Sequence, residues 1–413
     1  MRARSLAIAC AAFIGAPAAL SQNAPEPPTE AQRELMRQED QLGQETCGVP
    51  RNASDDYRPT PLLADQTRAP RVATEADYEV EVVATGLTHA WGMAFLPNGN
   101  MLVTIRGEGL RTVSPDGVVS DLISGTPEIR TPIRLFGMHD VILDKDFDQN
   151  RTIYLAYITQ VDGGAANTGY IASARLSEDE TSLTDYRILK EGQFTPRRIV
   201  QAQDGTLMAV TADVITPYVS AQSLQSAQGK VLRINTDGSI PADNPFVANL
   251  VADKSIYAVG FRDTQGMAFH PETGDLWLIE NHPRGGDELN RVEPGKNYGF
   301  PLISYGRDND GELLNDGKTQ QDGLEQPVYF WNPSIAFSGL AFYTGSAIPE
   351  WKNSAFMGGL SGLQLVRVEL EDGRVVAEEK LLRDRCERIR DVRMGPDGNL
   401  YVLTDAEDGN ILR

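Results

Sequence analysis

The sequence predicts an all-β protein, a six-bladed β-propeller that follows an irregular N-terminal extension. Three observations support this fold class: short runs of β-branched and alternating residues after Tyr78, frequent breaks at Gly, Asp, Asn and Pro, and a recurring unit of turn and strand. The chain has 413 residues, of which 41% are hydrophobic and 23% charged. This composition supports a large core and excludes a wholly disordered chain.

Residues 1–21 have the pattern of a secretory signal. Arg2 and Arg4 precede an apolar run from Leu6 to Leu20, and small residues stand at the expected cleavage point after Ser21. A membrane anchor is the alternative, but this run is shorter than the roughly 20 residues that a span needs. We therefore expect a periplasmic or secreted protein with no stable membrane insertion.

Residues 22–76 are predicted to be an extension or linker, because they are polar, contain many prolines and show almost no apolar periodicity. The propeller is expected over residues 77–413. Its repeated unit is clearest where the turn at 97–99 leads into a strand at 100–105. Equivalent units begin at 203–205, 271–274 and 396–398, and wider copies cover 146–158 and 354–371.

About six copies, separated by irregular intervals of roughly 45 to 80 residues, are typical of four-stranded blades with loop insertions. Each blade buries its faces only against its neighbours, so the ring must close. We expect the strand near Tyr78 to Ala84 to join the C-terminal blade. A β-sandwich is the alternative, which the repeated unit disfavours.

The acidic balance limits the class of partner. Removing the two signal arginines leaves 38 − 2 = 36 basic and 58 acidic residues, a formal charge of 36 − 58 = −22. Such a chain repels phosphate backbones, so we expect no nucleic-acid partner. Neutral or cationic small molecules are the expected ligands.

Two cysteines remain once Cys10 leaves with the signal. Cys47 and Cys386 form an even pair, and an exported protein reaches an oxidising compartment. A disulfide would tie the extension to the last blade, with two separate thiols as the alternative. Two cysteines fit no zinc-binding pattern.

Three stretches of the sequence contain motifs that are more specific than the repeated unit of turn and strand. The first runs from 86 to 117 around Trp91-Gly92-Met93-Ala94-Phe95-Leu96-Pro97. The second covers 260–271, 285–290 and 294–301, and the third covers 331–339 and 388–392. Together they resemble the soluble aldose sugar dehydrogenases that depend on pyrroloquinoline quinone (PQQ), the glucose and sorbosone dehydrogenase family, over residues 78–413.

The resemblance implies an oxidoreductase with PQQ and calcium in a central cleft of the propeller. The reaction would oxidise the anomeric carbon of a small sugar to a lactone, with hydride transfer to the quinone. The chemistry needs a base for the hydroxyl proton, a divalent cation and cationic groups for the carboxylates of the quinone. The physiological electron acceptor is not specified.

Motif matches imply the cofactor-binding residues, which are Arg262, Asp263, Trp331, Ser334, Arg388 and Arg390. Arginine suits this role because its planar fork binds carboxylates and stacks on aromatic planes. The alternative reading of Arg388 and Arg390, which alternate on a strand, is a solvated face.

Calcium ligands follow from the same resemblance. The backbone carbonyls of His282 and Pro283 match those that bind the calcium at the quinone. Glu288, Tyr298 and Asp308 match a second, structural calcium site, since hard oxygen ligands suit this ion. The alternative for Glu288 and Asp308 is that they are ordinary surface acids.

The sequence departs from the family at the catalytic base. The stretch that opens the third blade begins with Gln193-Phe194 where the family has its histidine, and neither side chain accepts a proton near neutral pH. The family's lysine falls at or near Ser361. His139 and His282 remain as candidate bases, with His139 preferred and a packed histidine as its alternative. A non-catalytic periplasmic sugar- or ligand-binding propeller is the competing function.

Overall fold

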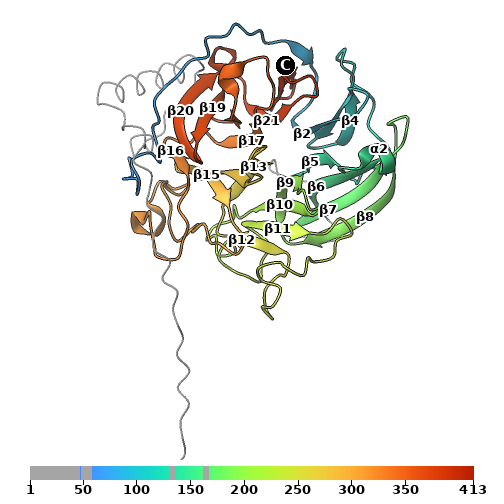
Figure 1. The fold of residues 1–413 in the computed structure, drawn as a ribbon. Helices are drawn as coiled ribbons and strands as arrows, with labels where there is room; N and C mark the ends of the chain where they lie inside the picture. The colour runs from blue at the N-terminus through green and yellow to red at the C-terminus, as the bar shows by residue number, and fades with distance from the viewer. Residues whose placement is uncertain (1–46, 48–57, 131–135, 161–166) are drawn as a thin grey trace, which may run out of the picture.

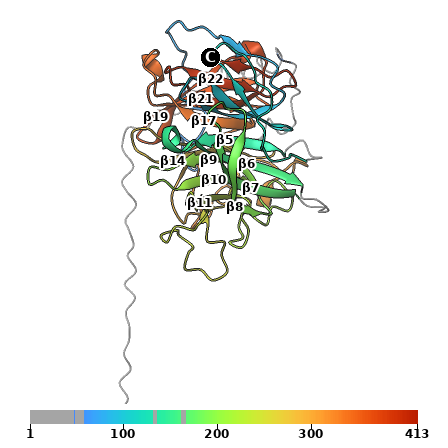
Figure 2. The same ribbon diagram turned by 90° about the vertical axis from the view of Figure 1, so that its right-hand side faces the viewer.

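The computed structural model describes residue 47 and residues 58–130, 136–160 and 167–413 of the chain. These residues form six small antiparallel sheets arranged as blades around one axis (Figure 1). Seen from the side, the ring is a thick disc (Figure 2). The prediction of an all-β, six-bladed propeller is confirmed. The predicted signal segment lies outside the described residues.

In chain order the strands are β1 (Val82–Ala84), β2 (Ala90–Phe95), β3 (Met101–Ile105), β4 (Gly109–Val113), β5 (Met138–Leu143), β6 (Thr152–Gln160), β7 (Asn167–Leu176), β8 (Leu183–Gly192), β9 (Thr195–Gln201), β10 (Leu207–Ala212), β11 (Lys230–Ile234), β12 (Ile256–Val259), β13 (Asp263–Phe269), β14 (Leu276–Asn281), β15 (Asp287–Val292), β16 (Tyr329–Trp331), β17 (Phe337–Phe342), β18 (Ser354–Gly359), β19 (Gln364–Glu371), β20 (Arg374–Leu381), β21 (Ile389–Met394), β22 (Leu400–Thr404) and β23 (Ile411–Leu412). The helical segments are α2 (Phe147–Asn150), η2 (Leu314–Gly317), η3 (Pro349–Trp351) and η4 (Arg383–Arg385).

The last blade contains both ends of the propeller. Its strand order is β1-β23-β22-β21, and Val82 of β1 pairs with Leu412 of β23. Gly117 lies beside this closure with a φ of +81°, and a Cβ there would lie 2.0 Å from the Val83 carbonyl oxygen. The position therefore requires glycine. The expected strand between Tyr78 and Ala84 is confirmed in the shorter range Val82–Ala84.

The first blade has three strands, β2, β3 and β4, whereas we expected four-stranded blades. Residues 119 and 124 make only isolated bridges, to Val113 and to Ser182 of the neighbouring sheet region. A single bridge does not extend into a ladder, so the outer edge of this blade remains irregular.

Buried apolar side chains pack between successive blades. One cluster joins Leu102 of β3 to Leu155 of β6, and another joins Met208 of β10 to Leu278 of β14. Clusters of the same kind lie at the other blade interfaces and across the closure. Because each blade is covered by its neighbours, the core is continuous around the ring.

The described part of the extension is packed against the fourth and fifth blades. Gln66 donates to the Pro327 carbonyl and its own carbonyl accepts from Phe330 N–H. Val72 N–H donates to the carbonyl of Glu378 on β20, and Thr74 Oγ1 donates to Glu379 at 2.8 Å. Composition predicted an irregular segment here, and the structure adds that it is hydrogen-bonded along a sheet edge (Figure 1).

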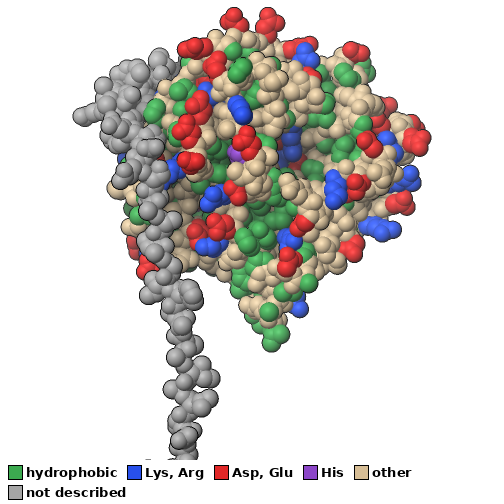
Figure 3. Space-filling view, in the orientation of Figure 1, with side chains coloured by type: hydrophobic (Ala, Val, Ile, Leu, Met, Phe, Trp, Pro, Cys, Tyr) green, Lys and Arg blue, Asp and Glu red, His purple; other side chains and the backbone are tan. Residues whose placement is uncertain are grey.

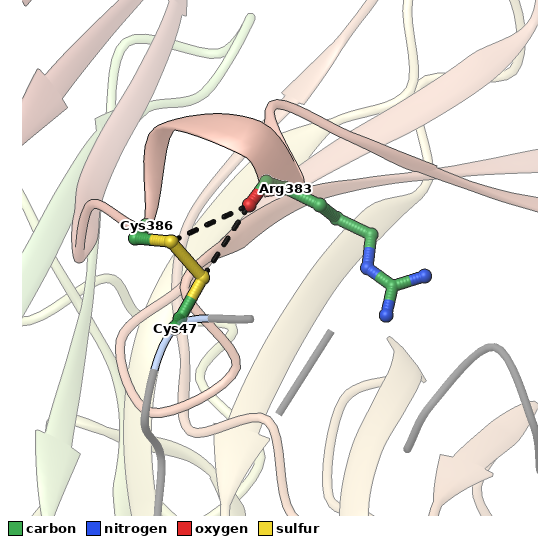
Figure 4. Close-up of a disulfide and its surroundings, with 3 residues drawn as sticks. All are labelled: Cys47, Arg383 and Cys386. Atoms are coloured by element: carbon green, nitrogen blue, oxygen red, sulfur yellow. Dashed lines mark hydrogen bonds between the residues drawn. A yellow bond between two sulfur atoms is a disulfide. The ribbon is translucent and has the colours of Figure 1, made fainter. Parts of the chain in front are cut away.

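The disulfide between Cys47 and Cys386 is confirmed, with the two Cα atoms 5.3 Å apart (Figure 4). Both sulfur atoms lie near the Arg383 carbonyl oxygen, at 3.5 and 3.8 Å. A disulfide sulfur has no hydrogen to donate, so these are packing contacts. The bridge joins residues separated by 339 positions and fixes the extension to the segment before β21.

Replacing Cys386 with serine is expected to lower the free energy of unfolding by about 2–5 kcal/mol, because the bridge restricts the unfolded chain over a long loop. Urea unfolding followed by tryptophan fluorescence measures the change. Reduction of the wild-type protein should produce the same loss and leave the variant unaffected. Equal unfolding midpoints for both oxidised proteins would contradict this role.

No helix among the described residues is long and apolar enough to cross a membrane.

Candidate functional site

The innermost strands β2, β5, β9, β13, β17 and β21 contact one another around the propeller axis. Buried charged side chains lie on them, and these are His139, Asp140, Arg197, Arg198, Asp263, Arg390 and Asp391. Figure 3 shows Lys and Arg side chains inside a recess near the centre of one face. Buried charges need partners, so the pairing of these groups defines the site.

Arg198 of β9 lies where the inner strands converge. Its side chain is 2% exposed, and all three guanidinium nitrogens donate hydrogen bonds. Its partners come from the innermost strand of each of the other five blades: the Trp91 carbonyl on β2 (3.2 Å), Asp140 Oδ1 on β5 (3.3 Å), the Gln265 carbonyl on β13 (2.9 Å), Ser338 Oγ on β17 (3.5 Å) and the Arg390 carbonyl on β21 (2.8 Å).

Arg198 also belongs to a buried ring of two arginines and two aspartates. It lies 3.3 Å from Asp140 and 3.2 Å from Asp391. Arg393 contacts the same two carboxylates, at 2.7 and 2.8 Å. Burial disfavours the charge on Arg393, but Asp391 and Asp140 outweigh it and raise the pKa of this guanidinium. The ring balances two positive against two negative charges.

A second charged cluster surrounds Asp405, which follows β22. Its carboxylate accepts from Arg390 Nη2 at 2.6 Å and from Arg388 Nη2 at 3.1 Å, and lies 2.8 Å from His89 Nδ1. Burial alone would raise the pKa of Asp405, but Arg390, His89 and Arg388 hold it well below its ordinary value. Burial in turn lowers the pKa of Arg390 to about 10, so this guanidinium stays charged at neutral pH.

Replacing Asp405 with asparagine is expected to cost about 3 kcal/mol at pH 6, because it leaves two arginines without their shared carboxylate. Since the folded-state pKa is depressed, this stabilisation is present above the unfolded pKa near 4 and is lost as the pH falls further. Urea unfolding of both proteins from pH 6 to pH 2 measures the difference. The difference between their free energies of unfolding should become smaller toward pH 2. A difference that does not change with pH would contradict the ion-pair explanation.

Arg390 on β21 and Arg388, which directly precedes that strand, connect to the preferred base through a chain of side-chain contacts. Arg390 Nη1 donates to Gln265 Oε1 at 2.7 Å, and Gln265 Nε2 donates to Asp263 Oδ2 at the same distance. Asp263 Oδ1 accepts from Arg197 Nε at 3.1 Å. Arg197 Nη1 lies 3.4 Å from His139 Nε2. The structure therefore brings Arg388, Arg390, Asp263 and His139 into one network.

His139 is fully buried in β5. Its Nδ1 lies 2.6 Å from the Pro196 carbonyl, which can only accept, so Nδ1 carries the proton and Nε2 has the lone pair. The imidazole ring packs on Trp91 with centroids 4.2 Å apart. The Arg390 guanidinium lies over the same indole, 3.9 Å from its centroid. The tautomer and ring position are both fixed by these contacts.

Gln193, at the position of the family histidine, is exposed and lies between β8 and β9. Its backbone carbonyl accepts from Gln228 Nε2 at 3.1 Å. Phe194 beside it is buried in the interface between the second and third blades. Neither side chain can accept a proton at the axis, as the sequence indicated.

Arg262 directly precedes β13 and is buried. Its Nη1 donates to the Asn281 carbonyl at 2.8 Å and its backbone N–H donates to Glu280 Oε2 at 2.7 Å. The guanidinium lies 6.0 Å from the centroid of the Tyr218 ring. Its Nε has no hydrogen-bond acceptor among the described residues, and the same holds for the Nε atoms of Arg388 and Arg390.

The loop between β14 and β15 contains the predicted carbonyl ligands of calcium. Asp287 anchors this loop, because its fully buried carboxylate accepts from His282 N–H at 3.0 Å, from Ser334 Oγ at 2.8 and 2.9 Å, and from Ile335 N–H at 2.8 Å. A Cβ at Gly286 would lie 2.5 Å from the Gly306 nitrogen, so the loop needs glycine there. Ser334 therefore helps to position this loop through Asp287.

The side chains of Glu280, His282 and Glu288 meet beneath this loop. One ligand atom from each lies within 4.8 Å of the other two, and all three residues are buried. Burial raises the pKa of Glu288. Burial disfavours a charged His282, but Glu280 and Glu288 outweigh it and raise the pKa of this imidazole.

Three predicted residues have their side chains engaged elsewhere. The Tyr298 hydroxyl donates to the Arg291 carbonyl at 2.6 Å, and Asp308 accepts from Tyr218 at 2.7 Å. Trp331 packs on Phe337 in the core between the fourth and fifth blades. Any part that these residues play in holding calcium or the quinone stays a prediction.

Sequence reasoning missed Gln265, Arg197, Arg198, Asp405 and Glu280 as members of the site. Arg197 and Arg198 follow closely after the segment in which this chain lacks the family histidine. Gln265 lies within the second of the three stretches that resemble the family. Glu280 is two residues before His282 at the end of a strand. In an extended segment, residues two positions apart point to the same face, so Glu280 and His282 are expected on one face. This spacing is the signal from which the cluster could have been predicted.

The comparisons with known proteins identify the family of this chain. The sequence pattern of the Glucose / Sorbosone dehydrogenase family matches residues 87–413. The aldose sugar dehydrogenase YliI of Escherichia coli (strain K12) is 39% identical over 350 residues, which are 83% of this chain and 94% of that protein.

Solved structures show the same fold. The apo-form of the soluble aldose sugar dehydrogenase (Asd) from Escherichia coli matches with a TM-score of 0.77 and 38% identity, covering 81% of this chain and 98% of that chain. The PQQ-bound form of the aldose sugar dehydrogenase (Adh) from Streptomyces coelicolor matches with a TM-score of 0.64 and 25% identity, covering 83% and 99%. This chain belongs to the Glucose / Sorbosone dehydrogenase family.

Proposed function

We propose that this protein is a PQQ-dependent dehydrogenase that oxidises the anomeric carbon of an aldose to a lactone. The observation that supports this best is the group of arginines at the inner strands, in which Arg390 on β21 and Arg262 before β13 are buried and Arg388 before β21 is half-buried. Arg262, Arg388 and Arg390 each keep an Nε atom without an acceptor among the described residues. Such donors fit a ligand with several carboxylates, as PQQ is.

The anchored loop fits a calcium ion beside the quinone. Asp287 fixes the backbone at His282 and at the facing segment of Ile335, so the carbonyl groups of His282 and Pro283 are held in place. Backbone carbonyls are hard oxygen ligands that suit calcium. When bound, PQQ accepts the hydride and calcium polarises it.

The protein's own contribution is orientation and removal of a proton. The sugar gives up a hydride from its anomeric carbon and a proton from the hydroxyl on that carbon. We propose that His139 Nε2 accepts this proton, since Nδ1–H is committed to the Pro196 carbonyl. Arg197 Nη1 donates toward the Nε2 lone pair at 3.4 Å while Arg197 Nε is held by Asp263, so this contact has to open when Nε2 takes the proton. We further propose that the enzyme is exported and works in the periplasm or outside the cell.

Reconstitution tests the function. The mature protein, loaded with PQQ and calcium, is mixed with a panel of aldoses and an artificial electron acceptor. We expect a shifted quinone spectrum, turnover, and lactone as product. A shifted spectrum without turnover would favour the non-catalytic sugar- or ligand-binding propeller, which the exposed Gln193 at the family's histidine position supports. No spectral shift and no turnover would end the dehydrogenase proposal.

Replacing His139 with alanine is expected to lower kcat by about 100-fold or more and to leave PQQ uptake unchanged. The matched control is His270→Asn, because His270 lies in a turn where its Nδ1 accepts from Glu272 and Thr273 N–H. Steady-state rates with the best sugar measure both variants. Full activity of His139→Ala would assign proton removal to another group.

A further inference from the structure

Two buried carboxylates face each other across neighbouring strands of the fourth blade. In the register of β14 and β15, Glu280 is directly opposite Glu288. Glu280 is fully buried and Glu288 is 4% exposed. Like charges in this arrangement destabilise a sheet, and burial increases the cost. Such a pair is relieved either by a proton on one of the carboxyl groups or by positive charge between them.

His282 points its imidazole into the same space. Its Nδ1 lies 2.8 Å from Ser304 Oγ, and that oxygen also accepts from Gly306 N–H at 3.1 Å. Ser304 thus holds the ring so that Nε2 faces the two carboxylates, 3.6 Å from Glu280 Oε2 and 4.0 Å from Glu288 Oε1. His282 is 3% exposed, and its Nε2 has no hydrogen-bond partner among the described residues.

We propose that Glu280, His282 and Glu288 bind a divalent first-row transition ion such as Zn²⁺. An imidazole nitrogen with two carboxylates is a donor set for this class of ion, whereas calcium selects oxygen ligands alone. Ligands about 2.1 Å from a tetrahedral ion lie about 3.4 Å apart. The distances of 3.6 and 4.0 Å from His282 Nε2 to the two carboxylates are close to this value, and the spacing of up to 4.8 Å within the cluster contracts on binding. A water molecule completes the coordination.

The second contact of each ligand supports a preorganised site. Glu280 Oε2 accepts from Arg262 N–H at 2.7 Å, and Asn290 Nδ2 donates to Glu280 Oε1 at 3.1 Å. Asn290 Nδ2 also lies 3.3 Å from Glu288 Oε2. Together with Ser304, these groups orient all three ligands, as outer partners do in metal sites. The ion would tie β14 and β15 to the loop that contains Pro283.

Motif matching assigns Glu288 to a second, structural calcium. In this proposal Glu288 binds the transition ion in its place. Its existence does not depend on the quinone, because all three ligands are side chains of one blade. The consequence is structural: the ion would stiffen the segment between β14 and β15 before any cofactor binds. Metal binding can therefore be measured on quinone-free protein.

The experiment uses the mature protein without a histidine tag, stripped of metal with a chelator. Zn²⁺ is titrated calorimetrically in excess Ca²⁺, and Co²⁺ is titrated while visible absorption is recorded. We expect one Zn²⁺ per chain, bound in the presence of Ca²⁺, and a Co²⁺ spectrum of low-coordinate nitrogen and oxygen ligation. A chain that binds neither ion, or that exchanges Zn²⁺ for Ca²⁺, would overturn the proposal.

Two variants locate the ion. His282→Asn keeps a polar group near Ser304 but removes Nε2, and Glu288→Gln keeps the shape while removing the charge. Each should weaken Zn²⁺ binding by about 100-fold or more. His270→Asn makes the same exchange in a turn and should bind Zn²⁺ like the wild type. Wild-type affinity in both site variants would place the ion elsewhere, and a poorly folded variant leaves the Co²⁺ spectrum of the wild type to decide.

Discussion

Replacing Arg390 with alanine is expected to weaken PQQ binding by about 100-fold, the loss of two charge-assisted hydrogen bonds. Arg390 is stacked on Trp91, paired with Asp405 and bonded to Gln265, so its position is fixed before any ligand arrives. A fixed cation loses little entropy on binding, which increases the effect of removing it. Titration of the quinone, followed by its absorption, measures the change.

Arg291→Ala is the matched control, because it removes the same charge from β15. The Arg291 side chain is 45% exposed, and its ion pairs among the described residues are with Asp275 and Glu293, whose side chains are 42% and 53% exposed. PQQ binding should be unchanged in this variant. Arg390→Lys should recover part of the affinity, since the charge returns without the planar fork. If Arg390→Ala, shown to be folded by circular dichroism, bound the quinone like the wild type, this arginine would have no part in holding it.

Replacing Arg198 with methionine is expected to cost about 3–5 kcal/mol of stability. The change leaves Asp140 and Asp391 with Arg393 as their remaining arginine, so one buried negative charge loses its counterpart. It also removes the donor that bonds to an inner strand of each other blade. Urea unfolding at pH 7 measures the loss.

Arg233→Met provides the comparison. Arg233 on β11 pairs with Asp204 and Asp243, which are 50% and 75% exposed, so its loss should cost less than about 1 kcal/mol. The double variant Arg198→Met with Asp140→Asn should recover part of the stability, because it removes the uncompensated charge as well. A single variant as stable as the wild type would show that the ring of charges is dispensable.

Local sequence signals predicted the architecture well. Turns such as Pro97-Asn98-Gly99 and Pro396-Asp397-Gly398 each precede the second strand of a blade, β3 and β22. Turn residues and strand alternation are patterns of a few consecutive residues, so they can be recognised without knowledge of the rest of the chain. The pairing of the strand near Val82 with the C-terminal blade was predicted because a closed ring has to bury the faces of its last blade.

The network of charged and polar side chains at the propeller axis could not be predicted in the same way. Arg198 and Gln265 acquire their roles only when strands from six blades converge, and their partners lie up to 192 positions away in the sequence. A charged or polar residue within a strand has the same local pattern whether it points to solvent or to the axis. Motif matching found Arg390 but not Asp405, because the partner lies in a different part of the blade.

The pairing of Val82 with Leu412 has a consequence for how the protein is made. During synthesis β1 is made before all the other strands of the propeller and β23 after them. Until β23 is made, β1 has no partner and the ring stays an open arc with unpaired edges. Deletion of Ile411 and Leu412 should therefore leave an aggregation-prone product.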